Sequence, residues 1–172
     1  MKRTITVLVQ NRSGVLNRIT GLFARRQYNI DSITVGVTDN PTVSRMTFVV
    51  VADAMENIEQ VMKQLHKQVD VLKVKDVTDE ATVSRELALV KISATAEQRA
   101  EIGSLAETFR AQMIDVGRDS LTLQVTGHTD KVEAFIELIK TYGIQEIART
   151  GVTAINRSVK SQTEASRLTL IH

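Results

Sequence analysis

The sequence of 172 residues contains no cysteine, no tryptophan, a single proline and only 3% aromatic residues. The absence of cysteine excludes disulfide bonds, thiol nucleophiles and cysteine-ligated metals. The three histidines, His66, His128 and His172, are widely spaced, so no local pattern brings two of them together as metal ligands. We therefore expect no metal site within this chain.

Long apolar runs are also absent. No stretch of about 18 apolar residues exists, so no helix is expected to cross a bilayer, and no membrane partner is expected. Lys2 and Arg3 are not followed by the apolar segment of a signal peptide, and a cytoplasmic location is therefore expected. The 22 basic and 20 acidic residues are interspersed. Since nucleic-acid sites usually combine a basic stripe with stacking aromatic residues, nucleic acid is not an expected partner.

The most informative pattern lies in residues 4–37, which read as strand, polar loop, amphipathic helix and strand. In residues 4–10 apolar and polar side chains alternate, as in a half-buried strand. From Val15 onward the apolar residues follow helical spacing. The loop between them, residues 11–14, has the sequence Asn-Arg-Ser-Gly. We expect Ser13 or Asn11 to cap the helix and Gly14 to permit a tight turn.

This loop has two interpretations. A helix N-terminus with free N–H groups beside small polar side chains is suited to bind a carboxylate or a phosphate. Alternatively, the loop is an ordinary turn and helix cap with a structural role only. Because such caps are common, residue chemistry alone favours the structural interpretation.

The rest of the chain repeats one order of elements, β-α-β-β-α-β, in each half. In the first half the further elements are strands at residues 30–37, 43–51 and 70–77 and a helix at residues 54–68, which Asp53 can cap. In the second half they are strands at residues 85–93, 113–116, 121–125 and 144–152 and helices at residues 95–112 and 131–141, with Thr129 or Asp130 as the second cap. This order predicts an α+β fold with two ferredoxin-like units in tandem.

The predicted boundaries are a first domain at residues 4–78 and a second domain at residues 84–155, joined by a polar linker. Residues 156–172 form a tail that is either disordered or adds a strand or a partner contact. The second unit has residues 94–97, Ala-Thr-Ala-Glu, where the first has its polar loop. Because only the first loop contains glycine and an Asx residue, the difference favours a function for it.

Catalytic motifs are missing: there is no GxSxG, Walker loop or GxGxxG sequence. One enzymatic alternative is a small phosphatase of the acylphosphatase type, in which Arg12 and either Asn29 or Asn40 would bind phosphate. The glycine-rich loop of that family is absent, so this alternative rests on fold analogy. We assign no catalytic residue.

Several stretches resemble a known family. The first unit resembles an ACT domain, a βαββαβ module that binds amino acids at the interface of two copies. The chain as a whole resembles the small regulatory subunits of acetolactate synthase (acetohydroxyacid synthase). The stretches that carry this resemblance span most of the chain from Asn11 to Arg157: NRSGVLNRITGLFARRQYNIDSITVG, PTVSRMTFVV, KQLHKQVDVLKV, SRELALVKI, FRAQMIDV and IARTGVTAINR.

The resemblance implies a regulator that is not itself the catalyst and holds no cofactor. The implied partner is a large catalytic subunit that uses thiamine diphosphate, magnesium and FAD. The small subunit would activate it and confer feedback inhibition by a branched-chain amino acid, usually valine. The resemblance also implies a homodimer, with two ACT domains paired edge to edge and the effector between chains. The alternative is a stand-alone ACT-type amino-acid sensor that acts on another partner.

The resemblance places an effector site at Asn11, Gly14 and Asn29. The backbone amides of Gly14 and Val15 would bind the effector carboxylate. The amide oxygens of Asn11 and, from the facing chain, Asn29 would accept from its ammonium group. Gly14 is expected to leave space that a larger residue would fill. The expected wall for an aliphatic side chain is Val15, Leu16, Ile30 and Val35, for which ordinary core packing is the alternative.

Overall fold

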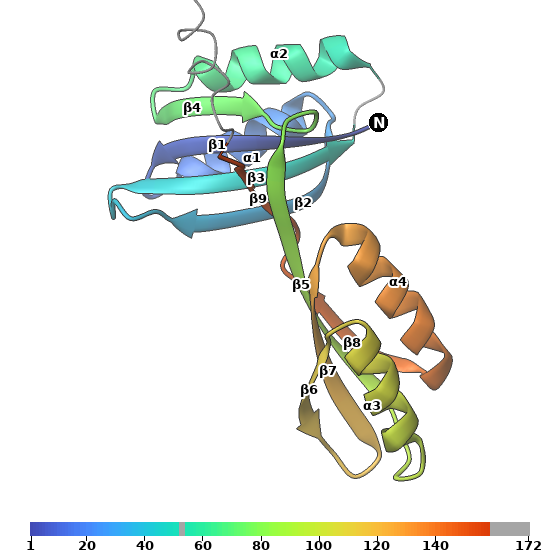
Figure 1. Cartoon of the computed structure of the whole chain (residues 1–172). Coiled ribbons are helices and arrows are strands. Elements are labelled where there is room, and N and C mark those ends of the chain that lie inside the picture. The colour runs from blue at the N-terminus through green and yellow to red at the C-terminus, as the bar shows by residue number, and fades with distance from the viewer. Residues whose placement is uncertain (52–53, 159–172) are drawn as a thin grey trace, which may run out of the picture.

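The computed structural model describes residues 1–51 and 54–158. The chain forms two units, each a four-stranded antiparallel sheet with two helices on one face (Figure 1). This arrangement confirms the α+β fold with two βαββαβ units in tandem. None of the helices in the described residues has the length and apolar character needed to span a bilayer.

The first unit has the strand order β2-β3-β1-β4, which leaves β2 and β4 at the edges of its sheet. The alternation in β1 buries Ile5, Val7 and Val9 completely against the helices. Phe23 and Phe48 stack in this core, with ring centroids 4.9 Å apart. The elements are β1 (Lys2–Gln10), α1 (Val15–Arg25), β2 (Asn29–Val37), β3 (Val43–Val51), α2 (Met55–His66) and β4 (Val71–Asp76).

The second unit repeats this arrangement with the strand order β6-β7-β5-β8, and β6 takes the edge position that β2 has in the first. Its core is a separate cluster in which Phe135 is fully buried. The elements are β5 (Thr82–Ser93), α3 (Gln98–Thr108), β6 (Gln112–Val116), β7 (Ser120–Gly127), α4 (Thr129–Ile139), a short 3-10 turn (Lys140–Tyr142), β8 (Ile144–Arg149) and β9 (Thr153–Asn156).

Two strands differ from the sequence prediction where the units join. β5 begins at Thr82, inside the predicted linker, and its first four residues pair with β9. The strand predicted at residues 144–152 is wrong in extent, because Gly151 has φ 78° and separates β8 from β9. Asn156, the first residue of the predicted tail, still belongs to β9. Residues 159–172 lie outside the described residues.

The predicted helix caps are also corrected. The N-cap of α1 is Gly14, with no side-chain hydrogen bond, so the expected cap at Ser13 or Asn11 is wrong. The N-cap of α4 is His128, and neither Thr129 nor Asp130 takes that position.

The other two helices begin later than predicted. α2 begins at Met55 after Ala54, and the predicted cap Asp53 lies outside the described residues. α3 is shorter than the predicted helix at 95–112, because the backbone at Arg110 has φ 51° and leaves the helical conformation.

Candidate functional site

The N-terminus of α1 is open at the surface. Gly14 is in the left-handed conformation with φ 81°, and the first turn of α1 contains no acidic residue. The amide of Val15 donates to the carbonyl oxygen of Arg12 at 3.3 Å. The amides of Gly14, Leu16 and Asn17 have no acceptor within the described residues. Free N–H groups at the positive end of a helix favour an anionic ligand.

The side chain of Asn11 fixes the loop to the turn between β2 and β3 and leaves its Oδ1 atom without a donor in the described residues. Its Nδ2 donates to the carbonyl oxygen of Pro41 at 3.0 Å, and its backbone N–H donates to that of Thr42 at 2.7 Å. These bonds tie residues 11–14 to the turn between β2 and β3. The Oδ1 atom accepts no hydrogen bond from the described residues. It is therefore available to accept one from an ammonium group beside the open end of α1.

The corresponding loop in the second unit makes two side-chain hydrogen bonds that the first loop lacks. The N–H of Thr95 donates to Oε1 of Gln98 at 3.0 Å, and the N–H of Gln98 donates to Oγ1 of Thr95 at 3.4 Å. This reciprocal pair precedes α3, whose N-cap Glu97 makes no side-chain hydrogen bond. The amides of Glu97, Arg99 and Ala100 have no acceptor within the described residues. The two loops therefore differ in side-chain hydrogen bonding, whereas both helices begin with free amides.

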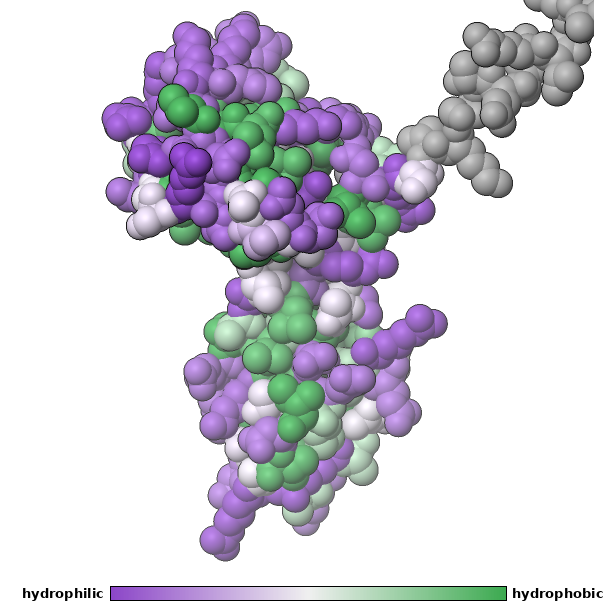
Figure 2. All heavy atoms as spheres, turned by 90° about the vertical axis from the view of Figure 1, so that its left-hand side faces the viewer, coloured by the Kyte–Doolittle hydropathy of each residue, from purple (hydrophilic) through white to green (hydrophobic). Residues whose placement is uncertain are grey.

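The expected aliphatic wall divides into exposed and buried members. Leu16 follows the loop and is 43% exposed, whereas Val15 is 2% exposed and packs in the core. Val35 and Val37 lie in the last three residues of β2 and are 48% and 58% exposed. That end of β2 leads into the turn that Asn11 contacts. Figure 2 shows apolar surface on this side of the first unit.

Asn29 and Ile30 are not part of this group within one chain. They begin β2, whereas the loop lies at the end of β2, nine residues along the strand. At the usual rise of a strand the two ends are about 26 Å apart. The Asn29 side chain is exposed and makes no hydrogen bond within the described residues, and Ile30 packs partly against the core.

The phosphatase arrangement does not form. Asn29 is at the far end of β2 from Arg12. The Oδ1 atom of Asn40 accepts hydrogen bonds from the backbone N–H and the hydroxyl of Thr42, at 3.0 and 2.8 Å, within the β2–β3 turn. Asn29 therefore cannot join Arg12 within one chain, and the side chain of Asn40 is oriented by its own turn.

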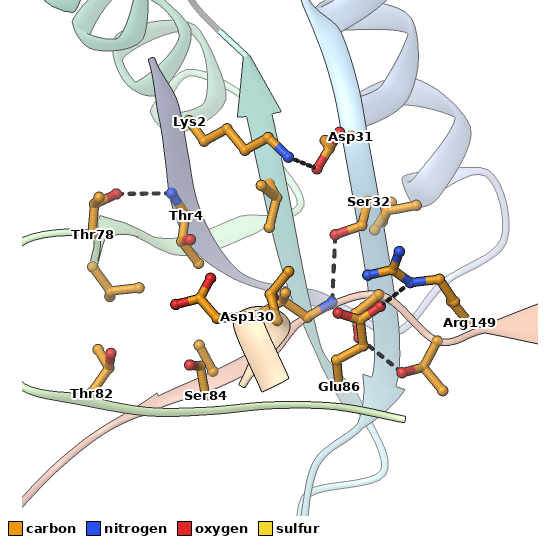
Figure 3. Close-up of a pocket in the computed structure, with 18 of the residues that line it drawn as sticks. Lys2, Thr4, Asp31, Ser32, Thr78, Thr82, Ser84, Glu86, Asp130 and Arg149 are labelled. Carbon is orange, nitrogen blue, oxygen red and sulfur yellow. Dashed lines mark hydrogen bonds and ion pairs between the residues drawn. The ribbon is translucent and has the colours of Figure 1, made fainter. Parts of the chain in front are cut away.

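A larger hollow lies between the two units, with a volume of about 830 Å³ (Figure 3). Several of its charged groups are engaged in ion pairs, such as Lys2 with Asp31 at 2.9 Å and Arg149 with Glu86 at 2.5 Å. The hydrogen bond that Arg149 donates to the carboxylate of Glu86 raises the pKa of Arg149. Within the described residues, no group of three or more histidine, aspartate or glutamate side chains is placed to hold a metal ion.

Comparison with known proteins identifies the family. The AHAS small subunit-like ACT domain matches residues 5–73, and the small subunit of acetolactate synthase matches residues 85–158. The acetolactate synthase small subunit of Bacillus subtilis is 55% identical over 167 residues, which cover 97% of each chain. The chain belongs to the acetolactate synthase small-subunit family.

Other members of this family agree with the assignment. A probable acetolactate synthase small subunit of Archaeoglobus fulgidus is 51% identical over 93% of this chain and 99% of its own length. The crystal structure of the acetolactate synthase small subunit from Thermotoga maritima superposes with a TM-score of 0.83, at 43% identity, over 91% of this chain and 98% of that one. The open end of α1 therefore belongs to the ACT domain of an acetolactate synthase small subunit.

Proposed function

We propose that the chain is the regulatory subunit of acetolactate synthase in branched-chain amino-acid biosynthesis. It activates a large catalytic subunit and makes it sensitive to feedback inhibition by valine or a related amino acid. Catalysis, with thiamine diphosphate, magnesium and FAD, belongs to the partner subunit. The observation that carries this proposal is the uncapped N-terminus of α1 in the ACT domain of a small-subunit relative.

An amino acid fits the groups that the loop leaves free. Its carboxylate accepts hydrogen bonds from the amides of Gly14 and Leu16, which have no acceptor in the described residues. Its ammonium group donates to Oδ1 of Asn11. An aliphatic side chain covers Leu16 and Val35, which are otherwise about half exposed. This combination favours a branched-chain amino acid over a charged one.

A second copy accounts for Asn29. Among the described residues β2 is an edge strand that pairs only with β3, so its outer edge can pair with the β2 of a partner. If two copies pair antiparallel about Ile33, position 29 faces position 37, because each lies four residues from the centre. Asn29 of the partner subunit then lies beside the loop at residues 11–14. Two asparagine amides, one from each chain, can then accept from one ammonium group.

Calorimetric titration with valine, leucine and isoleucine tests the site through two matched variants, Gly14→Asp and Gly14→Asn. Aspartate and asparagine have nearly the same shape and both tolerate positive φ, so they differ mainly in charge. We expect saturable heat with valine for the unmodified chain and for Gly14→Asn. For Gly14→Asp we expect affinity at least tenfold below that of Gly14→Asn, because a carboxylate at this position repels the effector carboxylate.

Two results would contradict this site. Equal affinities of the two variants for valine would show that a charge at position 14 does not affect valine binding. The absence of saturable heat with all three amino acids, for the chain alone and with the large subunit present, would reduce residues 11–14 to a structural turn.

A further inference from the structure

One segment of the second unit lies directly on the first. Residues 150–152, between β8 and β9, cross the face of the first sheet that its helices do not cover, and we call this segment the strap. Oγ1 of Thr34 donates to the carbonyl oxygen of Val152 at 3.0 Å, and the N–H of Val152 donates to Oγ of Ser32 at 3.4 Å. Figure 3 shows Ser32 and its bond beside the hollow between the units.

These two bonds are the direct polar contacts between the strap and the first sheet. No other hydrogen bond or ion pair joins described residues between 2 and 78 to described residues between 82 and 158. The joining segment adds a second link, because Glu80 pairs with Lys75 of β4 and also contacts Asn156 of β9. The seat of the strap on β2 is therefore one of two polar links that position the second unit on the first sheet.

Gly151 lets the strap approach this closely. Its φ of 78° lies in the region that favours glycine, and the residue is buried. A Cβ atom at Gly151 would lie 2.7 Å from Cβ of Ser32 and 3.1 Å from its Oγ. A side chain at this position would therefore push the strap away from β2.

The strap is held firmly at its other end. Arg149, which precedes it, pairs with Glu86 of β5 at 2.5 Å and with Glu133 of α4 at 2.7 Å. The N–H of Thr150 donates to the carbonyl oxygen of Leu87, and its hydroxyl accepts from the N–H of Leu87 at 3.1 Å. A displacement of the strap is therefore passed to β5 and α4.

β2 is the strand best placed to move the strap. It has a free outer edge, and its register with β3 is irregular between Ile30 and Ser32. Such an irregularity loosens the ladder at that point. Both ends of β2 belong to the proposed effector site, while Ser32 and Thr34 in its middle hold the strap.

We propose that the strap transmits effector binding from β2 to the second unit. This inference rests on the proposed effector site. An effector changes activity only if it binds one arrangement of the subunit better than another. The two arrangements differ in how the strap sits on Ser32 and Thr34. When the effector and the partner subunit hold β2 between them, the strap places the second unit differently than when β2 contacts neither.

The test uses the complex with the large subunit and the double variant Ser32→Ala/Thr34→Val, which removes both hydroxyls with little change of volume. The matched control is Ser104→Ala/Thr108→Val, at two exposed positions of α3. Valine binding is measured by calorimetry, and inhibition is measured at saturating valine as a fraction of each variant's own activity. We expect both variants to bind valine, and we expect only the strap variant to lose at least half of the maximal inhibition.

Gly151→Ala provides a second variant that displaces the strap by sterics and leaves both hydroxyls in place. We expect the same loss of maximal inhibition with valine still bound. Valine binding with full inhibition in both strap variants would overturn the inference and leave the proposed function intact. Failure of the unmodified complex to bind valine would overturn both proposals.

Discussion

At the scale of single residues, Gly14 has the strongest influence on the candidate site. The sequence predicts that Gly14 leaves space which a larger residue would fill, and a Cβ at this position meets no atom of the described residues within 4 Å, so the space beside it is open. The constraint is the backbone, which has φ 81°. A residue with a side chain is strained there whether or not a ligand is bound.

The two glycines of this region should therefore respond oppositely to alanine. Gly14→Ala is expected to lower the free energy of unfolding by about 1 kcal/mol, because alanine disfavours positive φ. Gly21→Ala, in the interior of α1, is expected to raise it by about 0.5–1 kcal/mol, because alanine is the better helix former and its Cβ meets nothing within 4 Å. Urea denaturation of both variants measures the two changes, and changes of the same sign would contradict this explanation.

Residue chemistry also shows how far the site could be predicted from sequence. Asn11, Gly14 and Leu16 lie on one loop and the first turn of its helix, so local spacing was enough to group them. Val15 has the same spacing, but its side chain enters the core and its amide bonds Arg12. The difference depends on which way the first helical turn faces, which the spacing alone does not fix.

At the scale of elements, the proposed dimer depends on which edge strand pairs with a second copy. β2 and β6 have equivalent positions in the two sheets, and both expose large apolar side chains. β2 has nine residues and β6 has five, and each has one register irregularity with its neighbour. A longer edge offers more backbone groups for pairing, so β2 is the better candidate for the dimer.

Lysine substitutions on the two edges test this choice. Val35→Lys is expected to convert the dimer to a monomer, because a charged side chain on an edge strand opposes strand pairing. Met113→Lys, at a similarly exposed position on β6, is expected to leave the dimer intact. Sedimentation velocity measures the mass of both variants. A dimer in Val35→Lys together with a monomer in Met113→Lys would assign dimerisation to the other edge.

The order of the elements followed from periodicity, whereas their ends often did not. Alternation in residues 4–10 and helical spacing from Val15 onward reflect burial on one face, which the fold preserves. The last strand was predicted as continuous because residues 144–152 give no sign that Gly151 takes positive φ. The cap of α1 was missed because its N-cap is the glycine itself, with no side-chain donor or acceptor.

At the scale of the whole molecule, the arrangement of the two units was beyond sequence reasoning. Ser32 and Val152 are 120 residues apart, and no periodic pattern links a serine on one strand to a backbone amide in a distant connection. Periodicity does not place Asn29 either, because it lies at the far end of β2 from the loop, and only the family resemblance assigned it to the facing chain. Periodicity describes single elements, whereas these contacts depend on tertiary and quaternary packing.

The central claim is regulation of a catalytic partner, and one assay tests it most directly. Acetolactate formation by the purified large subunit is measured alone, with the chain, and with the chain and valine, alongside Gly14→Asp. We predict that the chain raises activity severalfold, that valine lowers the raised activity, and that Gly14→Asp activates but is not inhibited. Unchanged activity of the large subunit on addition of the chain would contradict the claim, and valine binding under those conditions would point to a stand-alone amino-acid sensor.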